Sequence, residues 1–178
     1  MKMIVLVIDV QNGITDNRLY NFGGFIDNVK KIIHTARENH IEVIYVQHDD
    51  GAGTGFSIGD EEFDIYPEIY PHDNEKRFVK TTNSAFCNQE FKTYVNNLDV
   101  HTIVVVGLQT NFCIDATIKS AYDLGYQVIV PQYANSTFDN QYMSKETTYR
   151  YYNEFIWPDR FAKCISVDET VEMMNNKR

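Results

Sequence analysis

Three residues whose types could together perform nucleophilic catalysis stand at or just after the ends of apolar runs: Asp9, Lys80 and Cys113. A thiolate attacks carbonyl carbon, a carboxylate can carry the proton that the thiol loses, and an ammonium group stabilises both negative charges. Cys113 opens an amphipathic segment that ends at Gly125, so the amides at a helix start would favour its thiolate. We therefore predict a thioester on Cys113 that water hydrolyses, with N–H groups of the turn Leu108–Cys113 receiving the oxyanion.

Each of the three residues also has a purely structural interpretation. An isolated cysteine after a strand is usually a small buried apolar residue, a carboxylate at a strand end can cap the next loop, and a lysine can be solvated. Only a joint position on one edge of a sheet favours catalysis. Cys87 and Cys164 lack such a setting, and we interpret both as structural.

The elements that must position these residues form a predicted α/β fold. Six short apolar stretches predict strands: Met3–Asp9, Glu42–His48, Arg77–Lys80, Thr102–Gly107, Gln127–Val130 and Lys163–Val167. Helical patterns separate most of them, which predicts a doubly wound, six-stranded parallel sheet with helices on both faces. In the order 3-2-1-4-5-6, ligands bind beyond the carboxyl ends of the first and fourth strands, where the strand order reverses. That order places the three candidate residues on one edge.

Apolar spacing and capping signals predict the helices. Four residues at helical spacing follow the first strand: Ile26, Val29, Ile33 and Ala36. A second set precedes the fourth strand: Phe91, Tyr94, Val95 and Leu98. A helix over 144–155 and a capping box at 166–169 complete the pattern. The long irregular segment Asp49–Lys76 then predicts a functional loop or lid at the ligand-binding edge.

Length and charge restrict the function classes. The 178 residues fit one domain, 1–178, and the net charge of −9 from 16 basic and 25 acidic residues argues against a nucleic-acid surface. No apolar run approaches the roughly 20 residues that span a bilayer, so we expect no membrane partner. Three widely spaced cysteines form neither a disulfide framework nor a metal pattern, which favours a cytoplasmic protein.

Three segments carry a resemblance to a known superfamily. They are Ile8–Gly13, Phe78–Phe86 and Val106–Cys113, and they occur in the order expected along nearly the whole chain. The sequence resembles the isochorismatase-like cysteine hydrolases, which include the nicotinamidases.

The resemblance implies an Asp–Lys–Cys triad at Asp9, Lys80 and Cys113. It also implies a cis peptide between Leu108 and Gln109, with the amides of Gln109 and Cys113 forming the oxyanion hole. A small-molecule substrate and a homo-oligomer, a dimer or a tetramer, are further implications. True isochorismatases cleave a vinyl ether and do not require the cysteine, so its presence favours hydrolysis of an amide-type C–N bond.

The sequence departs from the metal-dependent members of the superfamily. Nicotinamidases carry an Asp-x-His after the second strand and further histidines, whereas this chain has His48, Asp49 and Asp50 there and no other histidine before His72. We favour a polar loop start over a metal site at this position, and we predict a metal-independent enzyme without a cofactor. Tyr133 stands where many relatives have Asp, which concerns the far side of the pocket or an oligomer contact.

The predicted pocket is small and partly aromatic. Its candidate substrate contacts are Gln11, Phe22, Phe56, Phe63 and Phe112, although Phe63 fits a core position equally well.

Two other functions remain open at this point. The doubly wound pattern also suits a nucleotide- or flavin-binding Rossmann or flavodoxin module, but no G-x-G-x-x-G follows the first strand. A catalytically inactive relative that acts as an oligomeric scaffold is the third interpretation, and the complete set of Asp9, Lys80 and Cys113 argues against it.

Overall fold

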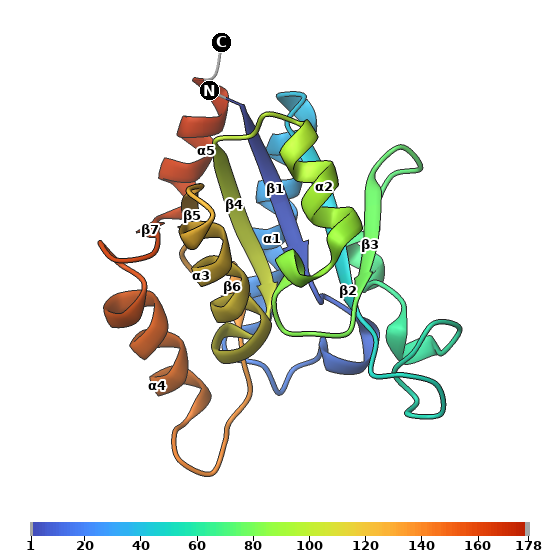
Figure 1. Cartoon of the computed structure of the whole chain (residues 1–178). Coiled ribbons are helices and arrows are strands. Elements are labelled where there is room, and N and C mark those ends of the chain that lie inside the picture. The colour runs from blue at the N-terminus through green and yellow to red at the C-terminus, as the bar shows by residue number, and fades with distance from the viewer. Residues whose placement is uncertain (1, 177–178) are drawn as a thin grey trace.

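The computed structural model describes residues 2–176 and contains a parallel sheet between two layers of helices (Figure 1). The strands are β1 (Met3–Ile8), β2 (Glu42–His48), β3 (Lys76–Lys80), β4 (Thr102–Leu108), β5 (Gln127–Pro131), β6 (Asn135–Ser136) and β7 (Lys163–Ile165). Their order is β3-β2-β1-β4-β5-β7, and β6 pairs with β4. The predicted order of the six strands is therefore confirmed. The two-residue strand β6 was not predicted because it is too short to show a periodic pattern.

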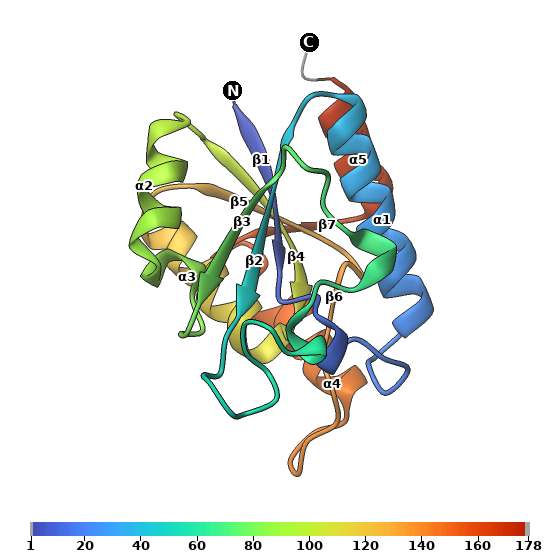
Figure 2. The same ribbon diagram turned by 90° about the vertical axis from the view of Figure 1, so that its right-hand side faces the viewer.

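The helices lie where apolar spacing predicts them. They are α1 (Phe22–Glu38), α2 (Gln89–Asn97), α3 (Asp115–Asp123), α4 (Lys145–Arg150) and α5 (Val167–Asn175). Figure 2 shows α1 and α5 on one face of the sheet and α2 and α3 on the other. Ser166 forms the predicted capping box, and the helix expected over 144–155 is α4 continued by the π-helical turn Tyr151–Ile156. Within residues 2–176, no helix is long and apolar enough to cross a membrane.

Strand β1 is the central support of the site. All six of its residues are buried, because alternate side chains enter the two hydrophobic cores that flank the sheet. Val5 and Val7 face the core shared with α1 and α5, whereas Leu6 and Ile8 face the core shared with α2 and α3. A strand held on both sides gives Asp9, the next residue, a fixed position.

Gly107 allows β1 and β4 to approach closely at their carboxyl ends. Its φ is +124°, a conformation that suits glycine, and it pairs with Ile8 in the sheet. A Cβ atom at this position would lie 2.0 Å from the carbonyl oxygen of Ile8. The absence of a side chain at Gly107 therefore brings Asp9 close to the turn that carries Cys113.

We predict that Gly107→Ala lowers the free energy of unfolding by more than about 2 kcal/mol, because the methyl group collides with backbone and φ is unfavourable. Urea denaturation followed by circular dichroism measures the change. Gly23→Ala is the matched control, since a Cβ at Gly23 meets nothing within 4 Å. The control should be unchanged or up to about 1 kcal/mol more stable. Equal stability of the two variants would contradict the close-approach explanation.

Candidate active site

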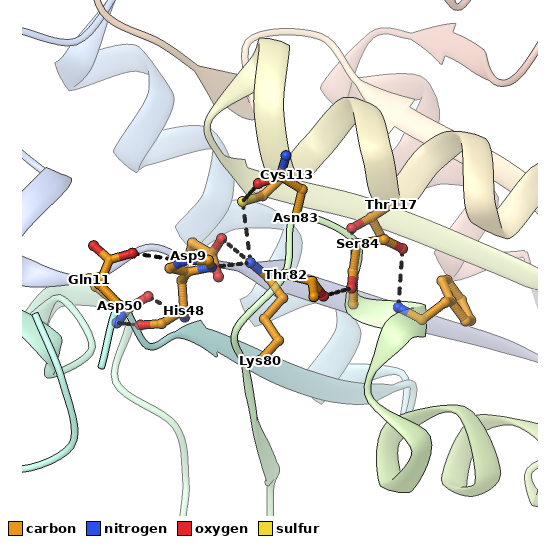
Figure 3. A network of polar contacts seen from close by, with 12 residues as sticks. Asp9, Gln11, His48, Asp50, Lys80, Thr82, Asn83, Ser84, Cys113 and Thr117 are labelled. Carbon is orange, nitrogen blue, oxygen red and sulfur yellow. Dashed lines mark hydrogen bonds and ion pairs between the residues drawn. The ribbon is translucent and has the colours of Figure 1, made fainter. Parts of the chain in front are cut away.

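The three predicted residues meet at the carboxyl edge of the sheet (Figure 3). Lys80 ends β3, Asp9 follows β1, and Cys113 lies in a π-helical turn, Thr110–Ile114, after β4. Lys80 Nζ donates to Asp9 Oδ2 over 2.7 Å and to Cys113 Sγ over 3.2 Å. The side chains of Lys80 and Asp9 are 1% and 2% exposed. An ammonium group therefore bridges a carboxylate and a sulfur atom that are far apart in sequence.

Asp9 is held in an unusual backbone conformation. Its φ is +52°, which aspartate tolerates better than most residues, and its N–H donates to the carbonyl of Val46 over 2.8 Å. Only one carboxylate oxygen is paired, since Oδ1 is buried and has no hydrogen-bond partner among residues 2–176. The carboxylate thus retains a free acceptor at the site.

His48 is a third partner of Lys80. Its Nδ1 lies 3.0 Å from Lys80 Nζ, and its Nε2 lies 3.0 Å from Asp50 Oδ1. An ammonium group can only donate, so Nδ1 accepts and the imidazole proton is on Nε2, where it donates to Asp50. The three protons of Lys80 then have three acceptors.

The side chain of Gln11 is hydrogen-bonded to the backbone of His48. Its amide nitrogen donates to the His48 carbonyl over 3.0 Å and to the Phe63 carbonyl over 2.9 Å, and its oxygen accepts from the His48 N–H over 2.7 Å. Gln11 is fully buried and does not line the cavity. The structure therefore places it as a support of His48 and not at the position of a substrate contact that the sequence predicted.

One group of metal-ligand types occurs among residues 2–176, and it surrounds Lys80. One donor atom from each of Asp9, His48 and Cys113 lies within 4.8 Å of the others. Lys80 Nζ also forms a hydrogen bond with an atom of each of these three residues. Of the neighbouring residues, Asp49 accepts from the N–H of Gly51, as expected for a polar loop start.

Burial dominates the proton affinities at the site. It raises the pKa of Asp9, against the opposing charge of Lys80. It raises the pKa of the Cys113 thiol to about 12, with a further increase from Asp9 and a decrease from Lys80. Cys113 precedes α3 inside the π-helical turn, and its burial there opposes the thiolate that the amides at the helix start were expected to favour.

A cavity of about 270 Å³ opens beside Cys113. Its walls are Asp9, Ile14, His48, Asp50, Phe56, Asn83, Gln109, Phe112 and Cys113. The predicted aromatic residues Phe56 and Phe112 are among them, but Phe22 and Phe63 are not. Phe22 packs edge-on against Tyr66, and Phe63 is buried in a 3₁₀ turn. The aromatic character was thus predicted, but only two of its four residues line the wall.

Several residues that line the cavity were not predicted as substrate contacts, although His48 and Asp50 were weighed as metal ligands or a polar loop start. Asp50, Ile14 and Asn83 line the cavity, and Asn83 Oδ1 lies 3.8 Å from Cys113 Sγ. The position of His48 follows from sheet register, because His48 pairs with Lys80 at the ends of β2 and β3. A reliable register for the third strand is the signal that would have revealed it.

The turn after β4 carries the predicted backbone feature: the Leu108–Gln109 peptide is cis. Gln109 and Cys113 both line the cavity. Tyr133 lies elsewhere: its ring stacks on Tyr149 with centroids 5.2 Å apart, and it does not line the cavity.

The chain is similar to known proteins over almost its full length. The family model for the isochorismatase domain matches residues 3–169. The isochorismatase family protein YrdC of Bacillus subtilis is 26% identical over 177 residues, which cover 96% of this chain and 95% of that protein. The ureidoacrylate amidohydrolase RutB of Agrobacterium fabrum is 22% identical over 191 residues, which cover 86% of this chain and 84% of that protein.

Solved structures agree with the sequence matches. A crystal structure of an isochorismatase family protein has a TM-score of 0.85 and 28% identity, and the match covers 92% of this chain and 98% of that one. A cysteine hydrolase from Pseudomonas syringae pv. phaseolicola shares the fold, with a TM-score of 0.89, 21% identity and coverage of 98% and 92%. These matches favour the hydrolase prediction over a Rossmann or flavodoxin module. The family model and the relatives show that this chain belongs to the isochorismatase family, a family of hydrolases.

Proposed function

We propose that the protein hydrolyses an amide-type C–N bond of a small molecule through a thioester on Cys113. The observation that carries the proposal is the buried Lys80 ammonium, which contacts Asp9 and Cys113, two residues that line the cavity. The name of the relative RutB describes hydrolysis of an amide, which supports the bond class. The cavity volume of about 270 Å³ suits a small-molecule substrate.

Attack begins from a neutral thiol and an ionised carboxylate. Asp9 accepts the thiol proton, for which the unpaired Oδ1 is available, as the sulfur of Cys113 bonds to the carbonyl carbon. Burial makes Asp9 a stronger base than an exposed carboxylate, and the Lys80 ammonium stabilises the negative charge as it moves to sulfur. The N–H groups of Gln109 and Cys113, the oxyanion hole that the resemblance implies, donate to the developing oxyanion, and both residues line the cavity.

Collapse of the tetrahedral intermediate breaks the C–N bond. Asp9 returns its proton to the leaving nitrogen, so ammonia or an amine departs and the acyl group remains on sulfur. Water then attacks the thioester and gives its proton to Asp9, which passes it back to the sulfur as the acid leaves. Lys80 remains protonated throughout, so the net reaction consumes one water molecule and regenerates the thiol.

We predict that Cys113→Ala lowers kcat by at least about a thousandfold, because no second thiol and no hydroxyl side chain is among the residues that line the cavity. Ammonia release from nicotinamide, pyrazinamide, N-carbamoyl compounds and small ureides measures turnover. Cys87→Ala is the matched control, since Cys87 is exposed and lies outside the cavity, and it should retain full activity. Full turnover by Cys113→Ala would contradict the nucleophile. A wild-type chain inactive on every amide would favour the non-catalytic scaffold.

The value of kcat/KM should also fall at acidic pH. Asp9 must be ionised to accept the thiol proton, and burial raises its pKa above the usual 3.8, so kcat/KM should fall with decreasing pH through that raised value. No alkaline rise is expected below about pH 10, because the Cys113 pKa is about 12. A pH profile of kcat/KM, with recovery at neutral pH as the control for unfolding, measures both limbs. A rise near the pKa of an ordinary thiol would instead show that the thiolate forms without Asp9.

A further inference from the structure

The cavity wall carries negative charge and no accessible cation. Two of its lining residues are carboxylates, Asp9 and Asp50, and none is Lys or Arg. The nearest cation, Lys80, has a side chain only 1% exposed and donates all three protons to protein acceptors. It therefore has no donor left for an anionic group of a substrate.

The charge of Asp50 is available to the cavity. Its side chain is 55% exposed, and its one side-chain hydrogen bond among residues 2–176 is with Nε2 of His48. Because Nδ1 of His48 accepts from the Lys80 ammonium, this imidazole is neutral and does not cancel the carboxylate charge. One imidazole ring separates Asp50 from Lys80, and Asp50 lines the same cavity as the reacting Cys113.

The loop around the cavity mouth extends the negative field. No Lys or Arg occurs between Arg37 and Lys76, whereas this stretch is rich in Asp and Glu. Among residues 2–176, no acidic residue of the segment 49–64 forms an ion pair with Lys or Arg. The carboxylate of Glu62 and the ring of Phe56, a cavity wall, both lie within 3 Å of the place where a Cβ on Gly13 would stand. Like charges this close to the entrance repel anions and attract cations.

We infer that the cavity takes amides that carry a positively charged group in preference to matched amides that carry a carboxylate, and that Asp50 is the residue that sets this preference. The inference rests on the proposed hydrolysis at Cys113. Asp50 would contact the ammonium or amidinium group of the substrate, while the carbonyl lies between Cys113 and the Gln109 N–H. The relative RutB is named for ureidoacrylate, a carboxylate, and would then differ from this chain in substrate charge.

The electrostatic potential around Cys113 can be measured with charged thiol reagents, without knowing the substrate. Aminoethyl and sulfonatoethyl methanethiosulfonate carry opposite charges on similar chains, and each forms a disulfide with a thiol and releases methanesulfinate. Mass spectrometry of the Cys113 and Cys87 peptides gives both labelling rates in one chain, with free mercaptoethanol as the reference for intrinsic reactivity. We expect Cys113 to favour the cationic reagent by about tenfold over that reference, and more than Cys87 does.

The variant Asp50→Asn measures the contribution of the Asp50 charge to this preference. This variant should lower the cation preference at Cys113 by at least about threefold, and added salt should lower it in the wild type. Asp73→Asn is the charge-matched control, because Asp73 is exposed and precedes β3 at the opposite edge of the sheet; it should leave the preference unchanged. Equal rates for the two reagents, a faster anionic reagent, or equal effects of the two variants would each overturn the inference.

A substrate series tests the same inference by turnover. The amide of γ-aminobutyrate, pentanamide and the monoamide of glutaric acid share a chain and a primary amide, and they end in ammonium, methyl and carboxylate. We expect kcat/KM to fall in that order. In Asp50→Asn, the ratio of kcat/KM for the ammonium substrate to kcat/KM for the methyl substrate should decrease. A cation preference in labelling with no turnover of any amide would contradict the proposed hydrolysis alone. Turnover that favours the carboxylate would contradict the charge inference alone.

Discussion

The site depends on one buried ammonium group. Lys80 Nζ lies within 3.2 Å of three acceptors, a carboxylate oxygen, an imidazole nitrogen and a sulfur, and its side chain is almost inaccessible to solvent. A buried cation is tolerated only when its protons are all accepted, so the orientations of Asp9, His48 and Cys113 are linked to one another. A buried pair of this kind adds little net stability, because desolvation offsets the attraction. The arrangement is therefore best explained by its chemistry.

The rest of the fold makes that arrangement possible. β1 is buried on both faces and fixes Asp9, Gly107 lets β4 approach β1, and the pairing of β2 with β3 sets His48 beside Lys80. Each of these features concerns the carboxyl edge of the sheet. Hydrophobic burial elsewhere in the fold offsets the desolvation cost of the buried Lys80 charge.

Sequence reasoning predicted what periodicity and strand ends determine. The order of the six strands and the meeting of Asp9, Lys80 and Cys113 follow from continuous apolar runs and from the geometry of parallel sheets. The direction of a loop side chain does not follow from such patterns, which is why Phe22 and Phe63 were assigned to the wall. The depth of burial does not follow from such patterns either, and burial raises the pKa of the Cys113 thiol.

The central claim is that Cys113 carries the acyl group during turnover. Rapid acid quenching of an amide reaction, followed by mass spectrometry of the peptide that contains Cys113, tests it most directly. The account predicts an added acyl mass on this peptide that hydroxylamine removes, and no adduct on the Cys87 peptide. Turnover that proceeds with no acyl group on Cys113 at any quench time, even when hydrolysis is slowed by low temperature, would contradict the account.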